Sequence, residues 1–323
     1  MMVPWDETDY KTFMDTEVRN FLATKVREGQ FESFDGARLQ YYYAVQPGAR
    51  AAVVMVHGFT EFFGKFHEVF YNFFDQRYDV FFIEQRGHGL SHRDVENKQL
   101  VHIDSFETYV EDLKSFIDQV VLENAPDLPL LLYAHSMGGC VSALFLEEHA
   151  GYFKAALLSS PMLKMYYGDV KVWQADLLAK TSRVLGWETR PLPNFSPFDP
   201  EHPDFEHSSG LSRARFDYAF HLKLANENYQ TSGGTYGWCV SGMDACTRLI
   251  DDAYKVKIPV LICQAGRDTM VDNEGQNIFA RHAKNCTIRR FPDSRHEIYN
   301  STGPMLRDYE DTVVGFYDRV LQS

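Results

Sequence analysis

The short segment AHSMGG contains a serine, Ser136, with the local pattern of an enzymatic nucleophile. The apolar run LPLLLYA (128–134) predicts a buried strand before it, and the residues after Gly138 predict a helix. A nucleophilic serine on a sharp strand-to-helix turn needs small residues two positions before and two after it, because the backbone is crowded there. Ala134 and Gly138 meet this need. The alternative is that Ser136 is only the N-cap residue of the helix.

A serine hydroxyl is a weak nucleophile and needs a base to take its proton. In enzymes with this strand-turn-helix motif, an acid and then a histidine follow the serine along the chain. Asp268 comes directly after the apolar run PVLICQ, and His296 follows the last predicted strand. We therefore expect Asp268 to hold the tautomer of His296. Two competitors have other expected roles: Asp272 as a helix cap and His282 as a surface residue.

The segment VVMVHGFTEFFGKF places His57-Gly58 immediately after another predicted strand. A backbone N–H from this loop, together with the N–H that follows the nucleophile, can hold the oxyanion of a tetrahedral intermediate. The predicted donors are the amides of Phe59 and Met137, and each such donor typically contributes roughly 3 kcal/mol to the transition state. We expect His135, next to the nucleophile, to point away from the reacting face and only to pack.

A sheet of buried parallel strands could position these residues. Short runs that are apolar without alternation are typical of strands buried on both faces, and they recur here with helical patterns between them. They are AAVVMVH (51–57), DVFFIEQ (79–85), LPLLLYA (128–134), AALLSS (155–160), PVLICQ (259–264) and CTIRRF (286–291). Two earlier segments flank Asp35-Gly36, a hairpin-turn dipeptide. This order predicts a mixed, mostly parallel sheet with helices on both faces.

A stretch of nearly a hundred positions, about residues 162–250, separates two of these strands. A loop of this length is rarely without structure in a compact domain. We therefore predict a core formed by residues 1–161 and 251–323, and a cap formed by residues 162–250 over the carboxyl edge of the sheet. A helical pattern near residues 212–228 lies within the predicted cap.

Composition excludes several classes of protein. The formal net charge is −13 and no cluster of Lys and Arg is present, so nucleic acid is not an expected partner. The 13 N-terminal residues lack the pattern of a signal peptide, and no apolar run is long enough to span a bilayer. The five cysteines are scattered and odd in number, which is typical of reduced thiols. We expect a cytoplasmic protein with at most transient contact with membranes or micelles.

Taken in order, HGF, QRGHGLS, AHSMGG, the Asp268 loop and RHEI resemble the monoacylglycerol lipase and lysophospholipase branch of the α/β-hydrolases, most closely the bacterial lysophospholipase L2 type. The cap segment GGTYGW (233–238) also resembles that type. The resemblance implies an eight-stranded α/β-hydrolase fold with an inserted cap. Three positions depart from the usual pattern: Ala134 and Ala265 replace glycines, and Glu84 replaces an aspartate.

The resemblance implies a carboxylic ester hydrolase that releases fatty acid from lysophospholipid or monoacylglycerol through a Ser136, Asp268 and His296 triad and an acyl-enzyme. Tyr236 and Trp238 are candidate substrate-binding residues in an aromatic cap, and the alternative is that these aromatic residues form the core of the cap itself. The other cap aromatics considered are Tyr166, Tyr167, Trp173 and Trp187.

No cofactor or metal is expected, because His88 and His92 have ligand-like spacing but no third partner. Three alternative functions stay open. An aminopeptidase-like enzyme would need a buried acidic cluster for the substrate ammonium, for which residues 199–206 offer four acids that we expect to be solvated. The others are a C–C bond hydrolase with the same triad and a non-catalytic ligand-binding module.

Overall fold

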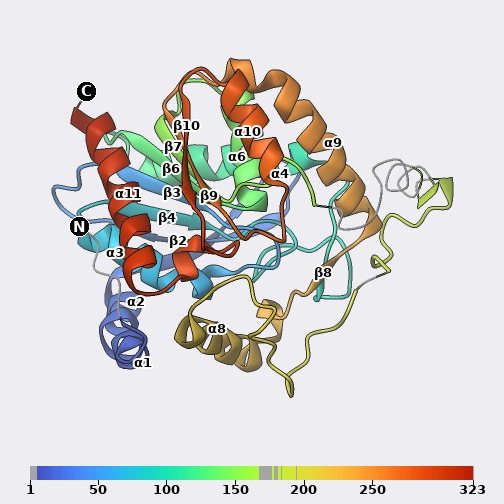
Figure 1. Cartoon of the computed structure of the whole chain (residues 1–323), viewed down its shortest axis with the longest axis horizontal. Helices are drawn as coiled ribbons and strands as arrows, with labels where there is room; N and C mark the ends of the chain where they lie inside the picture. The colour runs from blue at the N-terminus through green and yellow to red at the C-terminus, as the bar shows by residue number, and fades with distance from the viewer. Residues whose placement is uncertain (1–5, 167–176, 178–180, 183, 194, 323) are drawn as a thin grey trace.

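The computed structural model describes residues 6–166, 177, 181–182, 184–193 and 195–322. Its centre is an eight-stranded sheet with the order β1-β2-β4-β3-β6-β7-β9-β10 (Figure 1). The pairs β1–β2 and β2–β4 are antiparallel, and all the others are parallel. The prediction of an eight-stranded, mostly parallel sheet is therefore confirmed. The strands are β1 Arg27–Glu32, β2 Arg38–Ala44, β3 Ala52–Val56, β4 Asp79–Ile83, β6 Leu130–His135, β7 Phe153–Ser159, β9 Val260–Ala265 and β10 Cys286–Phe291.

Helices cover both faces of the sheet (Figure 1). Because successive residues of a strand point to opposite faces, each central strand contributes to two cores. In β3, Val54 and Val56 pack with the helices on one face, while Val53 and Met55 pack with those on the other. The first face carries α4 Phe106–Phe116, α6 Met137–Glu148 and α10 Asn273–His282, and the second carries α3 His67–Asp75 and α11 Gly303–Gln322.

Serine side chains cap the N-termini of two of the helices. Ser105 accepts a hydrogen bond from the amide of Glu107 at the start of α4, a helix that continues through a π-helical turn (Ile117–Val121) and α5 Leu122–Asn124. Ser212 accepts one from the amide of Arg215 at the start of α8 Arg213–Ala225. Such caps satisfy amides that have no partner inside the helix.

Between β7 and β9 the chain leaves the sheet. It forms α8, the short 3-10 helix Glu227–Tyr229, the two-residue strand β8 Gly233–Gly234 and the long helix α9 Tyr236–Asp252. Strand β8 pairs with β5 Leu100–Val101, which ties this segment to the loop before α4. The separation of a core (1–161 and 251–323) from a cap (162–250) stays a prediction. Tyr167 and Trp173 lie outside the described residues.

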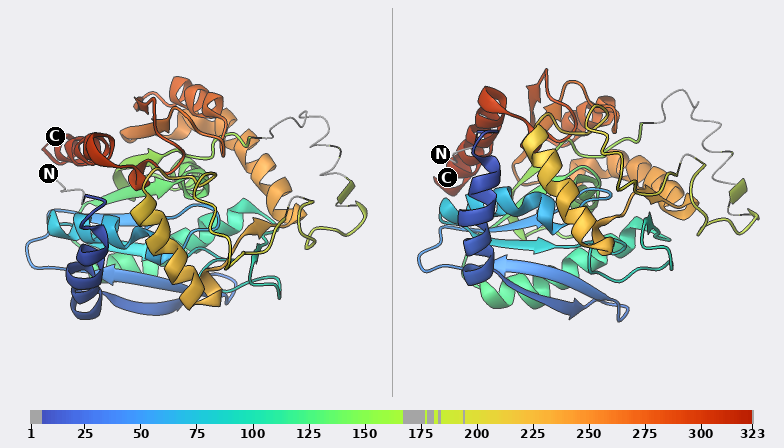
Figure 2. Two further views of the ribbon diagram at one scale, coloured as in Figure 1. Left: turned by 60° about the horizontal axis from the view of Figure 1, so that its bottom comes forward. Right: turned by 90° about the horizontal axis from the view of Figure 1, so that it is seen from below.

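The N-terminal helices α1 Tyr10–Phe13 and α2 Arg19–Lys25 lie beside α8 (Figure 2). The rings of Tyr10 and Tyr218 meet edge to face, with their centroids 6.0 Å apart. Arg215 of α8 donates hydrogen bonds to Glu68 of α3, at 2.6 and 2.7 Å. Helix α8 is therefore held by the N-terminal helices on one side and by the second helical layer on the other.

Candidate active site

Ser136 lies on a sharp turn between β6 and α6, at the carboxyl edge of the sheet. Its backbone has φ 51° and ψ −119°, a conformation that residues other than glycine rarely adopt. A Cβ atom on Gly138 would lie 2.3 Å from the carbonyl oxygen of Val56, so only glycine fits there. The Ser136 side chain makes no capping hydrogen bond to α6, which argues against the interpretation of Ser136 as a mere N-cap. The turn has the features expected of a nucleophile.

Asp268 and His296 lie in the loops that follow β9 and β10. The Nδ1 atom of His296 donates to Oδ2 of Asp268 at 2.7 Å. The Asp268 side chain is fully buried and its Oδ1 accepts from the amides of Met270 and Val271. Burial raises the pKa of Asp268, but the bonds from His296 and these amides outweigh it and hold the pKa below its usual value. An ionised Asp268 therefore fixes the His296 ring with Nε2 free to accept a proton.

The two competitors have the roles expected of them. Asp272 caps α10 by accepting from the amide of Glu274 at 2.9 Å, and it pairs with Lys164 at 2.6 Å. His282 is exposed at the end of α10, where its Nδ1 lies 3.1 Å from the carbonyl oxygen of Ile250.

The chain brings His296 to the same edge as Ser136. The His296 ring lies beside that of His135, the residue before Ser136, with the ring centroids 4.8 Å apart. On the other side, a Cβ atom on Gly58 would lie 2.9 Å from Cβ of Ser136. The loop after β3, the turn after β6 and the loop after β10 therefore converge around Ser136, as parallel strands that end at one edge allow.

The loop after β3 holds Phe59 between two anchored amides. The amide of Gly58 donates to Oε2 of Glu61 at 2.5 Å, and that of Thr60 donates to Nε2 of His88 at 3.1 Å. Within the described part of the chain, the amides of Phe59 and Met137 have no hydrogen-bond acceptor. Two unpaired N–H groups beside Ser136 are what an oxyanion site needs.

His57 holds this loop through hydrogen bonds and is uncharged. The amide of Gln85 donates to its Nε2 at 2.9 Å, so Nδ1 carries the proton and donates to the carbonyl oxygen of Gly58 at 2.7 Å. Complete burial lowers the pKa of His57 to about 4. His57 is thus a neutral positioning residue.

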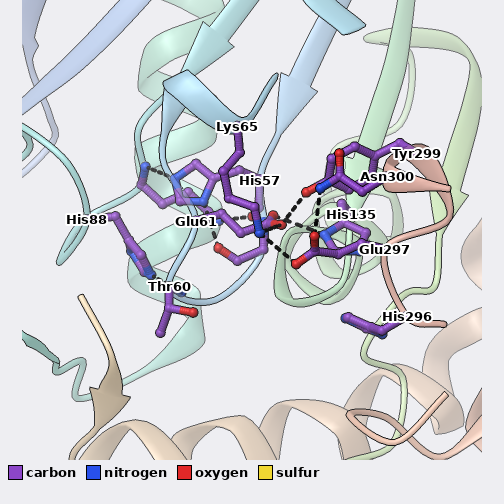
Figure 3. Close-up of polar contacts among 12 residues, drawn as sticks. His57, Thr60, Glu61, Lys65, His88, His135, His296, Glu297, Tyr299 and Asn300 are labelled. Carbon is purple, nitrogen blue, oxygen red and sulfur yellow. Dashed lines mark hydrogen bonds and ion pairs between the residues drawn. The ribbon is translucent and has the colours of Figure 1, made fainter. Parts of the chain in front are cut away.

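Behind the turn lies a buried network of four ionisable side chains and a tyrosine, centred on Glu61 (Figure 3). Glu61 accepts from Nδ1 of His135 at 3.0 Å and from the hydroxyl of Tyr299 at 2.6 Å. Lys65 donates to Glu61 at 3.3 Å and to Glu297 at 2.6 Å. We call these five residues the Glu61 network.

The Glu61 network corrects one expectation and adds residues that the sequence analysis did not find. His135 was expected only to pack, but it pairs with Glu61, and its ring lies against His296. Burial lowers the pKa of His135, but the carboxylate of Glu61 outweighs it and raises the pKa above its usual value. Likewise, burial raises the pKa of Glu61, but His135 and Lys65 hold it well below its usual value. The available signal was an acid and a lysine, four residues apart, in the aromatic loop TEFFGKF.

Trp238 and Tyr236, the predicted substrate-binding residues, are both buried at the start of α9. Trp238 stacks on Phe59, with the ring centroids 4.0 Å apart, and its indole N–H lies 3.3 Å from the sulfur of Met137. It therefore contacts both residues whose amides are the candidate oxyanion donors. Tyr236 lies farther out, beside Trp187 at 6.2 Å, and Tyr166 is exposed.

The other candidate ligand sites have simpler explanations. Both ring nitrogens of His88 make hydrogen bonds to backbone groups. No group of residues that could hold a metal ion is found within the described residues. The four acids of the stretch 199–206 are exposed, as expected of a solvated loop. Among the helices of the described segments, none is long and apolar enough to cross a membrane.

Comparison with known proteins shows the family and the fold. A hydrolase family described as serine aminopeptidase, S33, matches residues 47–303. A probable lysophospholipase L2 of Haemophilus influenzae is 27% identical over 265 residues, covering 81% of this chain and 82% of that protein. Human monoglyceride lipase is 26% identical over 272 residues, covering 82% of each chain. The crystal structure of a soluble variant of the Saccharomyces cerevisiae monoglyceride lipase superposes with a TM-score of 0.73 at 18% identity, covering 92% of this chain and 95% of that one.

Proposed function

The chain belongs to the serine aminopeptidase S33 family of α/β-hydrolases, and from this premise we propose that it hydrolyses monoacyl lipid esters with Ser136 as nucleophile. Its lysophospholipase and monoglyceride lipase relatives identify it as an ester-hydrolysing enzyme. The observation that carries the proposed mechanism is the 2.7 Å bond between His296 and the buried Asp268, at the sheet edge where Ser136 occupies its strained turn.

In the proposed reaction, Oγ of Ser136 attacks the acyl carbonyl carbon while Nε2 of His296 takes the hydroxyl proton. The carbonyl oxygen becomes an oxyanion held by the amides of Phe59 and Met137. The intermediate then expels the alcohol, which receives the proton from His296. Water attacks the resulting acyl-serine by the same steps, releasing the fatty acid and restoring the Ser136 hydroxyl. Asp268 stays ionised and stabilises the imidazolium of His296 throughout.

We assign the aromatic side of the site to the acyl chain. Trp238 packs over Phe59 and Met137, so an acyl group bound with its carbonyl at these amides would continue along the indole. Tyr236, at the first position of α9 and beside Trp187, is proposed as a second substrate-binding residue. In this proposal residues 162–250 form a cap that selects the substrate, and no cofactor takes part. The scattered cysteines favour the cytoplasm as its location.

The test is a panel of four substrates given to the wild type and to Ser136→Ala: a short nitrophenyl ester, a monoacylglycerol, a lysophospholipid and an aminoacyl anilide. We expect the wild type to hydrolyse the two lipids and the variant to lose about 10⁶ in kcat. Cleavage of the anilide alone would replace the ester proposal by an aminopeptidase. Activity that survives in Ser136→Ala would refute the nucleophile.

A further inference from the structure

Next to the candidate active site lies a pocket of about 380 Å³ between α8 and the loops after β3 and β10. Its lining includes Thr60 and Glu297. Thr60 directly follows Phe59, a candidate oxyanion donor, and Glu297 directly follows the proposed base, His296. In Figure 3, Thr60 and His296 both lie below the Glu61 network, Thr60 to the left and His296 under Glu297. The pocket therefore adjoins the loops that carry Phe59 and His296, and Trp238 is not among its lining residues.

The lining residues of this pocket are mostly polar, and nearly all of its charged side chains have a direct hydrogen-bonding partner. Lys65 binds Glu61 and Glu297, and Arg215 binds Glu68. At the rim, Asp199 pairs with His202, and Asp204 pairs with His207. Lys65 and Arg215 are therefore neutralised by buried carboxylates, whereas Asp199 and Asp204 form hydrogen bonds to exposed histidines at the rim.

Lys223 of α8 is the exception. Within the described part of the chain it is the one charged lining residue with no ion pair or hydrogen bond from its ammonium, which lies 5.8 Å from the centre of the Phe198 ring. The Lys223 side chain is half-buried, and the resulting loss of solvation, together with the nearby Lys65, lowers its pKa to about 8 against the smaller opposing effect of the carboxylates of Glu297 and Glu61. Because no carboxylate contacts this ammonium directly, an anion that enters the pocket can pair with it.

The chemistry of the proposed reaction suggests where that anion comes from. The acyl chain is assigned to the aromatic side, so the alcohol half of the ester must extend to another side of Ser136. In a lysophospholipid that half is a glycerol carrying a phosphate, whereas in a monoacylglycerol it is glycerol alone. The phosphate is a multiple acceptor of charge-assisted hydrogen bonds, which the unpaired ammonium can donate.

We propose that this pocket receives the alcohol half of the substrate and that Lys223 binds its phosphate, so that phosphate-bearing monoacyl lipids are preferred over monoacylglycerols. This inference rests on the proposed ester hydrolysis and adds the head group to it. Lys223 is here a specificity residue that touches the leaving group and takes no part in moving protons.

The experiment compares two substrates that differ only in the phosphate: octanoylglycerol and octanoylglycerol 3-phosphate. Short acyl chains keep both substrates monomeric, so that adsorption to micelles does not enter. kcat/KM is measured for the wild type, Lys223→Met, Lys223→Arg and, as a matched control, Lys284→Met, which removes an exposed lysine far along the chain. We expect Lys223→Met to lose about tenfold or more on the phosphate substrate, mainly through KM, and less than twofold on the other.

Two further readouts separate binding from a structural role. The wild-type preference for the phosphate substrate should fall as pH rises through about 8, because Lys223 then loses its charge, whereas Lys223→Met should show no such fall. Lys223→Arg should keep most of the preference, and Lys284→Met all of it. Lys223→Met should also unfold at no lower temperature than the wild type, since it removes an unpaired charge.

Each result has a distinct meaning. A wild type that hydrolyses both substrates with equal kcat/KM overturns the phosphate site and leaves the proposed function in place. An equal loss on both substrates in Lys223→Met also overturns it and points to a structural role. A wild type that hydrolyses neither these substrates nor a nitrophenyl ester overturns the proposed function, and the phosphate site with it.

Discussion

The loops at the carboxyl edge of the sheet and the segment between β7 and β9 hold their polar side chains in different ways. At the sheet edge, Glu61 is buried and accepts hydrogen bonds from a backbone amide and three side chains. Asp268 is equally enclosed. In the segment between β7 and β9, helix α8 buries only Arg215, and the four acids of 199–206 are exposed.

This difference matches two different demands. A proton transfer between Ser136 and His296 needs atoms fixed to within a fraction of an ångström, and buried, hydrogen-bonded neighbours supply that. Recognition of an acyl chain or a head group tolerates more movement, so part of it can be carried by α8, whose described contacts to the rest of the molecule are mainly ion pairs, hydrogen bonds and ring contacts. Changes at the sheet edge should therefore be far more damaging than equivalent changes between β7 and β9.

The largest effect is expected at Asp268. Asp268→Asn keeps the shape of the side chain but removes the charge that fixes His296, so kcat should fall about 10⁴-fold. Asp272→Asn is the matched control: it changes the cap of α10 and should leave kcat within about twofold. Steady-state kinetics on a short nitrophenyl ester measures both. If Asp272→Asn lost more activity than Asp268→Asn, our assignment of the acid would be wrong.

The same variant has a pH signature in stability. Because the folded-state pKa of Asp268 lies below its unfolded value, its contribution is present above the unfolded pKa and is lost as pH falls through the folded pKa. Urea titrations at successively lower pH measure the unfolding free energy. Between neutral and acid pH this free energy should fall less in Asp268→Asn than in the wild type. If the unfolding free energy fell equally with pH in both proteins, the partners of Asp268 would not stabilise its ionised form.

The next largest effect is expected from a change in the Glu61 network, and its main effect should be on the unfolding free energy. Glu61→Gln leaves Lys65 and His135 without their shared carboxylate, and breaking a buried pair in this way costs about 4 kcal/mol of unfolding free energy. Chemical denaturation measures the loss. The counterpart between β7 and β9 is Glu227→Gln, which breaks an exposed pair with Lys98 and should cause no measurable change. Equal losses in the two variants would contradict the contrast between the regions.

The smallest effects are expected from removing a helix cap. The same change can be made in both regions, so the two can be compared directly. Ser105→Ala removes the cap of α4, and Ser212→Ala removes the cap of α8. Each should cost about 1 kcal/mol of helix stability. Global thermal unfolding should register Ser105→Ala. It registers Ser212→Ala only if α8 unfolds together with the sheet, whereas hydrogen exchange in α8 should rise in either case. Unchanged exchange in α8 would show that the Ser212 cap is not stabilising.

Local patterns were enough to predict much of this molecule. Apolar runs marked the strands, and the small residues around Ser136 marked its turn, because each depends on neighbours in sequence. The pairing of His135 with Glu61 was missed because these residues are 74 positions apart and meet only when β3 and β6 lie side by side. Nor does any local pattern reveal that Arg215 binds Glu68, 147 positions away.

The departures from the family pattern illustrate the same limit. Glu84 replaces the usual aspartate, and in the structure its longer side chain accepts from the amides of Phe63 and Leu90. A Cβ atom on Gly89 would overlap this carboxylate, at 2.0 Å. The glycine and the glutamate therefore form one arrangement, which only the three-dimensional contacts make visible.

The backbone at Ser136 also bears on how such a protein would evolve if selection for catalysis were lost. Its φ of 51° suits glycine better than any residue with a side chain. A glycine at this position would abolish the nucleophile and relieve the strain of the turn. In descendants freed from catalytic selection, substitutions at position 136 should therefore favour glycine. Such an inactive variant should be more stable than the active protein.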